Sequence, residues 1–248
     1  GGELRRRQYL AGLSIEDREL ILQQIAEDGK EASGSMGDDT PVAVLSSHFR
    51  PIAHYFRQNF SQVTNPPIDS LRENKVMSLK TRFGNLGNIL DFDNLTEENI
   101  YVLDSPILTN SQFKKFKKIF SKKLKILDCT FDVNNPLKDR IEQLKEECEI
   151  AVREGSSTLI LSDKKISDKS ASIPSVLVVG AVHSHLVKLG LRGYCSINVE
   201  SADILDTHSF AVLIGVGATT INPYLAIDSI FQRCQKNLFG KQNFNSCV

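Results

Sequence analysis

The second half of the chain alternates short apolar runs with longer stretches of helical periodicity. Four apolar runs predict strands: 124–129, 158–161, 195–199 and 219–222. Helices are predicted between and after them: 136–154, 174–189, 206–214 and 225–235. Strands that alternate with helices are typical of parallel βαβ units with right-handed crossovers. Because the units fall short of eight, the pattern predicts an α/β fold of the incomplete or decorated (β/α) TIM-barrel type.

The first half is less regular and is predicted to begin with a helix. Ser14 can cap the first N–H groups of a helix that ends near Gly29. Small and polar residues over 30–37 then predict a loop or hinge. We therefore expect two parts: residues 1–36, an N-terminal helix and linker, and residues 37–248, the main domain.

An aromatic stretch follows, with a helix predicted over residues 54–60. Apolar side chains at helical spacing are expected to face the core: Ile52, Tyr55, Phe56 and Phe60. The chain is then predicted to be extended, because residues before proline avoid the helical region.

Thr64 and Asn65 are predicted to end a short strand, and Pro66 and Pro67 to continue it as a rigid loop. On the residues alone, a structural turn and a functional loop are equally good interpretations. The loop would present two hydrogen-bonding side chains beside a backbone that proline fixes.

Composition narrows the classes of function. The 248 residues carry 30 basic and 30 acidic side chains, so the net charge is zero, whereas a general nucleic-acid binder is usually basic. No apolar run approaches the length of a membrane span, so we expect neither a nucleic-acid nor a membrane partner. The start carries neither a signal peptide nor a methionine, which favours a piece of a longer protein. Five cysteines without a CxxC pair favour reduced, packed thiols of a cytoplasmic protein and disfavour a metal or iron–sulfur centre.

Polar residues follow successive predicted strands: Asp132, Asp163, Glu200 and Asn222. In a β/α barrel the active site lies at this end, so these residues could surround a pocket as a ring of acids. The alternative is that they cap helices or hold turns. We favour the alternative, because no nucleophile–base pair or metal set accompanies them.

Three histidines could suggest zinc: His183, His185 and His208. In a helix, however, residues two apart point about 200° away from each other, so His183 and His185 do not meet one ion easily. Packing or interface roles are favoured, and no catalytic, cofactor-binding or metal residue is assigned. No GxGxxG or GxxxxGK[ST] fingerprint occurs, so this part of the chain is not expected to bind a flavin or nucleotide.

Seven lysines fall within residues 113–125, and a helix is predicted to run through this stretch to about Phe120. The lysines could contact an anionic membrane or a nucleic acid. A solvated helix face, with Phe113, Phe116 and Phe120 turned to the core, is favoured by the zero net charge.

Two long blocks, residues 37–69 and 173–226, resemble the central domain of the glutamate synthase large subunit. The second reads IPSVLVVGAVHSHLVKLGLRGYCSINVESADILDTHSFAVLIGVGATTINPYLA, with its proline-led helix, His-Phe-Ala-like helix and Asn-Pro-Tyr-Leu-Ala stop in the family's order. It departs from the pattern at Ser184, Ser201 and Ser209. These departures weaken any role assigned to the histidines.

The resemblance implies a non-catalytic domain between the amidotransferase (glutaminase) and FMN-binding domains of one chain. The parent enzyme would convert glutamine, 2-oxoglutarate and reductant into two glutamates. It would use FMN, an iron–sulfur cluster and NADPH or ferredoxin, with a possible reductase subunit. The loop Thr64, Asn65, Pro66 and Pro67 would lie near the ammonia tunnel between the sites. The alternatives are a stand-alone β/α-barrel enzyme that uses Asp132, Asp163 and Glu200, and an interaction module through which no ammonia passes.

Overall fold

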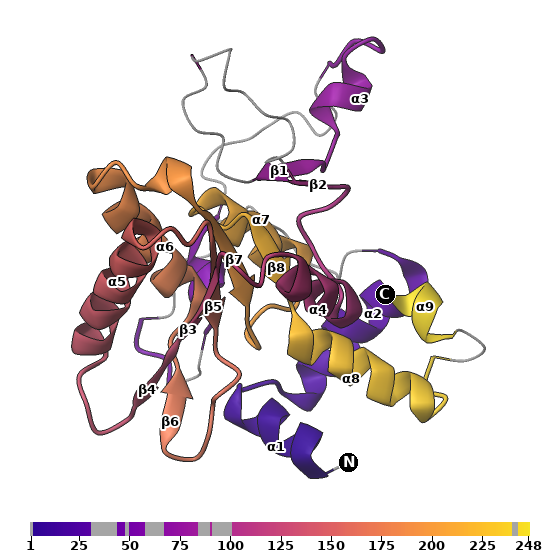
Figure 1. Cartoon of the computed structure of the whole chain (residues 1–248). Coiled ribbons are helices and arrows are strands. Elements are labelled where there is room, and N and C mark those ends of the chain that lie inside the picture. Colours follow the sequence, from indigo (N-terminus) through magenta and orange to yellow (C-terminus); the bar gives the residue numbers. More distant parts are fainter. Residues whose placement is uncertain are drawn as a thin grey trace.

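A parallel four-stranded sheet forms the centre of the structure, a computed structural model that describes residues 2–30, 44–47, 50–57, 67–83, 90, 101–239 and 243–248. Its strands lie in the order β3 (Leu124–Asp128), β5 (Thr158–Ser162), β7 (Ser196–Glu200) and β8 (Thr220–Asn222) (Figure 1). The register aligns Leu161 with Leu127 on one side and Val199 on the other. All four predicted strands and their parallel pairing are confirmed.

Three helices cover one face of this sheet: α5 (Leu137–Arg153), α6 (Ser175–Lys188) and α7 (Thr207–Gly215). Their buried side chains, such as Leu144, Val179 and Leu213, pack against Leu161 and Val199 of the strands. The amphipathic stripe predicted for residues 136–154 is confirmed. Gly155 and Gly190, which follow α5 and α6, have positive φ, as helix-ending glycines often do.

In the described part of the chain, α4 (Asn110–Ile119) covers the opposite face. Thr109 begins it with a capping box, accepting from Gln112 N while the Gln112 side chain accepts from Thr109 N. Phe113 and Phe116 pack around Ile160, the central residue of β5. The domain therefore has three layers, with helices on both sides of the sheet.

Residues 106–108 extend the sheet beyond β8. Leu108 N donates to Ile221 O and Ile221 N donates to Pro106 O, each at 2.8 Å, in a parallel bridge. This segment precedes β3 in sequence but pairs at the opposite edge, so α4 carries the chain back across the sheet. Among the described residues the sheet is open, and the predicted barrel is not confirmed. The space that a barrel would enclose is occupied by α4, whose aromatic side chains lie on Ile160.

Two small antiparallel pairs accompany the main sheet. β4 (Thr130–Asp132) pairs with β6 (Ser170–Ser172). β1 (Thr81–Phe83) pairs with β2 (Tyr101–Leu103) and, with α3 (Glu73–Val76), forms an arm that projects from the body of the domain (Figure 1).

The N-terminal segment packs against the C-terminal helices. α1 (Gly2–Leu10), a π-helical turn η1 (Asp17–Leu22) and α2 (Gln23–Asp28) lie beside α8 (Tyr224–Gln235) and α9 (Phe244–Cys247). The helix predicted after Ser14 is confirmed, and Ser14 Oγ accepts from Asp17 N at 3.0 Å. The helix over residues 2–10 was not predicted, because its many charged residues give no apolar period. The boundary expected near residues 36 and 37 lies outside the described residues.

The predicted aromatic helix over 54–60 is wrong where the structure describes it. A short 3₁₀ helix, η2 (Ile52–Tyr55), ends at Phe56, whose backbone is extended. Helical spacing is therefore lost. Only Ala53 is buried, Ile52 packs at the core edge, and Tyr55 and Phe56 are 50% and 44% exposed. Phe60 lies outside the described residues, as do Thr64, Asn65 and Pro66.

Candidate functional site

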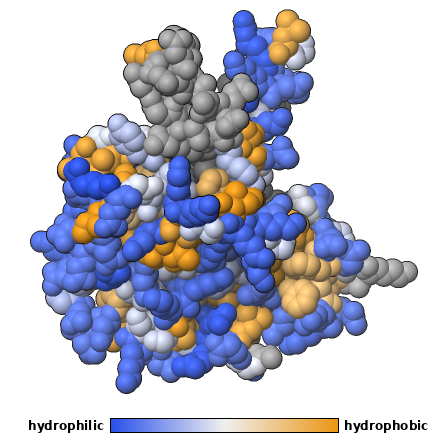
Figure 2. Space-filling model, viewed as in Figure 1, coloured by the Kyte–Doolittle hydropathy of each residue, from blue (hydrophilic) through white to orange (hydrophobic). Residues whose placement is uncertain are grey.

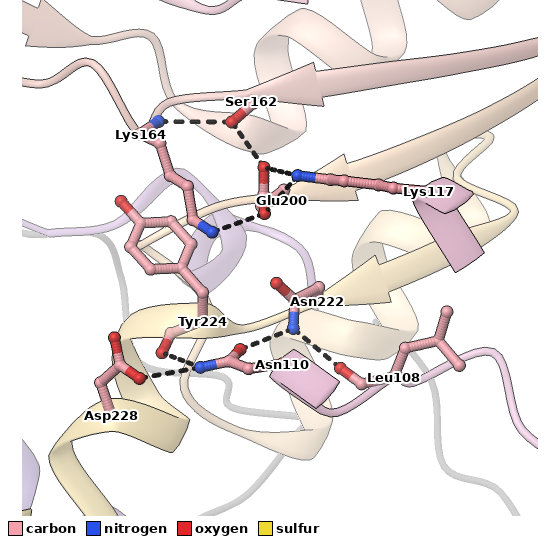
Figure 3. A network of polar contacts seen from close by, with 9 residues as sticks. All are labelled: Leu108, Asn110, Lys117, Ser162, Lys164, Glu200, Asn222, Tyr224 and Asp228. Atoms are coloured by element: carbon pink, nitrogen blue, oxygen red, sulfur yellow. Dashed lines mark hydrogen bonds and ion pairs between the residues drawn. The ribbon is translucent and has the colours of Figure 1, made fainter. Parts of the chain in front are cut away.

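The carboxylate of Glu200 is the centre of a polar network at the carboxyl edge of the sheet (Figure 3). Lys117 Nζ, from α4, donates to both of its oxygens at 2.8 Å. Lys164 Nζ, which follows β5, lies 2.7 Å from Oε1, and Ser162 Oγ donates to Oε2 at 2.9 Å. Two separate parts of the chain, α4 and the end of β5, therefore converge on one side chain that is only 3% exposed.

Glu200 is held as an anion. Burial opposes its ionisation, but the hydrogen bonds and charges of Lys117 and Lys164 outweigh burial, so its pKa is lowered. A carboxylate with a lowered pKa and both oxygens occupied is a poor proton acceptor. Its arrangement suits a structural ion pair that fixes α4 on the sheet.

Asp163 lies beside this network and joins the ends of three strands. Its Oδ2 accepts from Ser172 Oγ at 3.0 Å, Ser201 Oγ at 2.7 Å and the backbone N–H of Ala202 at 2.9 Å. Burial, followed by the nearby charge of Asp203, raises its pKa to about 6. Asp163 Oδ1 and the hydroxyl of Tyr224 are both buried and have no hydrogen bond among the described residues. Each nevertheless affects the pKa of the other.

Asn222 continues the polar edge at β8. Its Nδ2 donates to Leu108 O and to Asn110 Oδ1, each at 2.9 Å. Asn110 in turn donates to Asp228 Oδ1 at 2.8 Å and to Tyr224 O at 3.3 Å (Figure 3). These amides tie the start of α4 to the start of α8.

Of the four predicted strand-end residues, the structure brings three together: Asp163, Glu200 and Asn222. Asp132 stands apart. It is exposed in β4 and accepts from the backbone and side chain of Asn134, both at 2.9 Å, which holds a turn. The contacts of Glu200 and Asn222 join separate elements and are neither turns nor caps. The favoured interpretation, turns and caps, fits Asp132. Asp203 is a further example, because it accepts from the N–H of Ser175 at the start of α6.

Sequence reasoning missed the partners of these acids. Lys117 belongs to the lysine-rich stretch expected to be solvated; the other six lysines are exposed, whereas Lys117 turns inward. Asn198 was also missed, although it is fully buried and bonds Leu159 O and Thr220 Oγ1. The alternation of Ser196, Asn198 and Glu200 along one strand was the available signal, because it marks a polar sheet face.

The three histidines make three separate contacts. His183 Nδ1 accepts from Arg192 Nε at 3.1 Å, His185 Nε2 lies 3.0 Å from Glu149 Oε2, and His208 Nε2 lies 2.8 Å from Ala53 O. Burial and then the Arg192 charge lower the pKa of His183. Within the described residues these contacts give no shared metal position, and no cluster of three or more metal-ligating side chains is found there.

A hollow of about 440 Å³ lies between α1 and α8, and its lining includes Glu3, Arg7 and Phe231. It does not include Asp163, Glu200 or Asn222. Of the predicted tunnel loop, only Pro67 lies within the described residues, where it is exposed. In the part of the chain that the structure describes, no helix is both long and apolar enough to cross a membrane.

Comparison with known proteins identifies the family. The family described as "Glutamate synthase central domain" matches residues 6–247. The large chain of glutamate synthase [NADPH] from Azospirillum brasilense is 54% identical over 241 residues, 96% of this chain and 16% of that protein. The corresponding chain from Bacillus subtilis is 43% identical over 230 residues, 90% and 15% of the two chains.

A ferredoxin-dependent glutamate synthase, described as chloroplastic, from Spinacia oleracea is 41% identical over 233 residues, 92% of this chain and 14% of that protein. The chain thus spans only 14–16% of the length of these relatives. Because the family match covers nearly every residue, the chain belongs to the glutamate synthase central domain family.

Proposed function

We propose that this chain is the central, non-catalytic segment of a glutamate synthase and links its amidotransferase and FMN-binding domains. The parent enzyme would form two glutamates from glutamine, 2-oxoglutarate and reductant. The observation that carries the non-catalytic role is the internal pairing of the strand-end acids. Both oxygens of Glu200 accept from lysine or serine side chains, and Oδ2 of Asp163 accepts from two serines and a backbone amide.

This pairing distinguishes a structural edge from an active site. A catalytic carboxylate must present an oxygen to the substrate. The described contacts of Glu200 instead join α4, β5 and β7, and those of Asn222 join β8 to Leu108 and to α4. These contacts therefore fix the helices on the sheet, as expected for a rigid spacer between two other domains.

The surface is consistent with further domains of the same chain as partners. Large apolar side chains on the arm are strongly exposed, among them Leu71 (93%), Met77 (68%) and Leu79 (63%). Figure 2 shows apolar surface at the end of this arm, beyond the body of the domain. Exposed apolar patches commonly mark interaction sites.

The names of the relatives indicate which electron donors the parent enzyme would use. They include NADPH- and ferredoxin-dependent enzymes, so the parent would take electrons from one of these donors. FMN, an iron–sulfur cluster and a possible reductase subunit would then lie outside this chain, in the cytoplasm. The barrel-like architecture that the resemblance implies would require strands beyond those described.

The experiment substitutes Glu200 by Gln in the complete large chain. We expect glutamate synthesis per folded enzyme to stay within about twofold, with lower thermal stability. Loss of a general acid or base costs about 10²–10⁴-fold in rate, and a loss of that size would overturn the proposal. Asp132→Asn, at an exposed turn, is the matched control.

The tunnel part of the proposal concerns Thr64, Asn65, Pro66 and Pro67. Ammonia must pass between two sites away from bulk water, and a rigid loop with hydroxyl and amide groups suits a tunnel wall. In the complete enzyme, Thr64→Val should make glutamine hydrolysis exceed glutamate synthesis. Thr81→Val on the arm should leave the rates of glutamine hydrolysis and glutamate synthesis equal. Equal rates in both variants would mean that the loop does not line the tunnel.

A further inference from the structure

Two cysteines meet where the last helices of the described chain pack. Cys234 lies near the end of α8 and Cys247 in α9. Cys234 packs against the buried cluster that contains Cys247, and a hydrogen bond with the Cys234 side chain contributes to a raised pKa of Cys247. The other cysteines, Cys129, Cys148 and Cys195, lie in the main core.

Packing around the pair holds the two helices together. Cys247 belongs to a buried cluster with Ala26, Ile230 and Phe239, against which Cys234 packs. Ile230 and Cys234 are four residues apart and so share one face of α8. The rings of Phe231 and Phe244 meet edge to face at 5.2 Å beside them.

We propose that Cys234 and Cys247 form a reversible intramolecular disulfide when the chain meets a small disulfide oxidant such as oxidised glutathione. Thiols already in contact need little backbone movement to reach bonding geometry. The bond would join α9 covalently to α8 and, through the same cluster, fix it beside α2.

The reaction proceeds in two thiol–disulfide exchanges. Cys234, the more exposed thiol, loses its proton and attacks one sulfur of oxidised glutathione, which releases one glutathione. Cys247 then loses its proton and attacks the Cys234 sulfur, which breaks the mixed disulfide and releases a second glutathione. Two thiols are oxidised, one disulfide is reduced, and two protons pass to the two departing glutathione thiolates.

The second exchange is expected to be the slower one. Cys247 is buried, and burial together with Cys234 raises its pKa, so little thiolate is present at neutral pH. Reduced glutathione would reverse both steps.

The test treats the native chain with oxidised glutathione and then digests it with trypsin under non-reducing conditions. Cleavage after Arg233, Lys236 and Lys241 places the two cysteines on separate peptides, one of residues 234–236 and one that begins at residue 242. We expect these peptides joined, at their summed mass minus two hydrogen atoms, and separated again by reductant. The melting temperature should rise by about 5 °C, because the bond closes a short loop.

Matched variants complete the experiment. Cys247→Ser should give a stable glutathione adduct on Cys234 and no rise in melting temperature. Cys148→Ser, at a buried thiol whose pKa burial raises to about 12, should leave the cross-link unchanged. A glutathione adduct that persists on Cys234 in the unsubstituted chain, or a cross-link to another cysteine, would overturn the proposal.

Discussion

The pKa values of two buried carboxylates at the ends of neighbouring strands are shifted in opposite directions. Burial raises the pKa of Asp163 from 3.8 to about 6, whereas the two lysines lower the pKa of Glu200. Stability from Glu200 is present above its unfolded pKa and is lost as the pH falls through its lower folded pKa. Between pH ~4 and ~6, the change in the free energy of unfolding with pH is therefore expected to come from Asp163.

Asp163→Asn should become more stable relative to the unsubstituted chain as the pH rises through this window. Below pH ~4 the carboxyl is protonated in both states. Between pH ~4 and ~6 the unfolded state releases its proton first, so the native state loses stability, by ~2–3 kcal/mol in all. Asparagine cannot ionise and removes this loss. Urea unfolding at several pH values across the window measures the difference, and a difference independent of pH would contradict it.

Gly217 occupies a position where both the backbone conformation and the space around it require glycine. Its φ is +121°, and an added Cβ would collide with the imidazole of His183. That ring is held by Arg192, which also donates to Gly217 O at 2.9 Å. Gly217→Ala should lower the free energy of unfolding by about 2 kcal/mol or more.

Gly180 provides the matched control, because it lies inside α6 without a positive φ. Apart from its chain neighbours and the backbone of α6 itself, no atom of the described residues lies within 4 Å of the position that an added Cβ would take. Gly180→Ala should stabilise the chain by up to about 1 kcal/mol, since alanine favours the helix. Urea unfolding of both variants should therefore give shifts of opposite sign. If both variants changed the free energy of unfolding in the same direction, the added methyl group at residue 217 would not clash with His183 as predicted.

At the scale of elements, α4 is attached to the sheet by aromatic packing and by one charge. Phe113 and Phe116 cover Ile160, and Lys117 reaches Glu200 from the same helix. Lys117→Met should lower the free energy of unfolding by about 2 kcal/mol, since it leaves a buried carboxylate with Lys164 as its only cation among the described residues. Lys118→Met, at an exposed position, should change it by less than about 0.5 kcal/mol.

Urea unfolding again provides the measurement. An equal effect of the two substitutions would mean that the contact between Lys117 and Glu200 adds nothing to the attachment of α4. A raised pKa of Glu200 in the Lys117 variant, followed by NMR titration of its carboxyl carbon, would be the second sign that the pair is broken.

The regular βαβ units could be predicted from sequence because each depends on a local period and local end signals. Leu144 and Cys148 mark the buried face of α5, and Gly155 its end. The position of residues 106–108 beside β8 could not be predicted, because it depends on a pairing more than a hundred residues away. Local spacing also failed for Tyr55 and Phe56, where η2 ends after one turn.

The acidic and amide residues of the candidate site could be predicted from the sequence, but the lysines that pair with them could not. Asp163, Glu200 and Asn222 follow strands, and parallel strands end at one edge. Lys117 is one of seven lysines in a charged stretch, and only the packing of Phe113 and Phe116 decides which lysine faces inward. Tertiary structure therefore converts a possible ring of acids into a paired network.

At the scale of the whole molecule, the N-terminal segment packs against the main domain. Leu13 packs in a buried cluster with Tyr224 and Leu225, and Gln8 Nε2 donates to Ser229 Oγ at 2.8 Å. The described part of the segment predicted as helix and linker thus covers α8. Its removal would expose apolar surface and leave a buried hydroxyl with one partner fewer.

Deletion of residues 1–13 should therefore lower the free energy of unfolding by about 3 kcal/mol or more and expose α8 to hydrophobic dyes. Burial of one large aliphatic side chain alone contributes about 1.5–3 kcal/mol, and a hydrogen bond adds about 1 kcal/mol. Arg6→Ala, which breaks only the exposed pair with Asp168, is the control and should leave urea unfolding unchanged. If the deletion also leaves unfolding and dye binding unchanged, α1 is a detachable linker, and the domain begins after it.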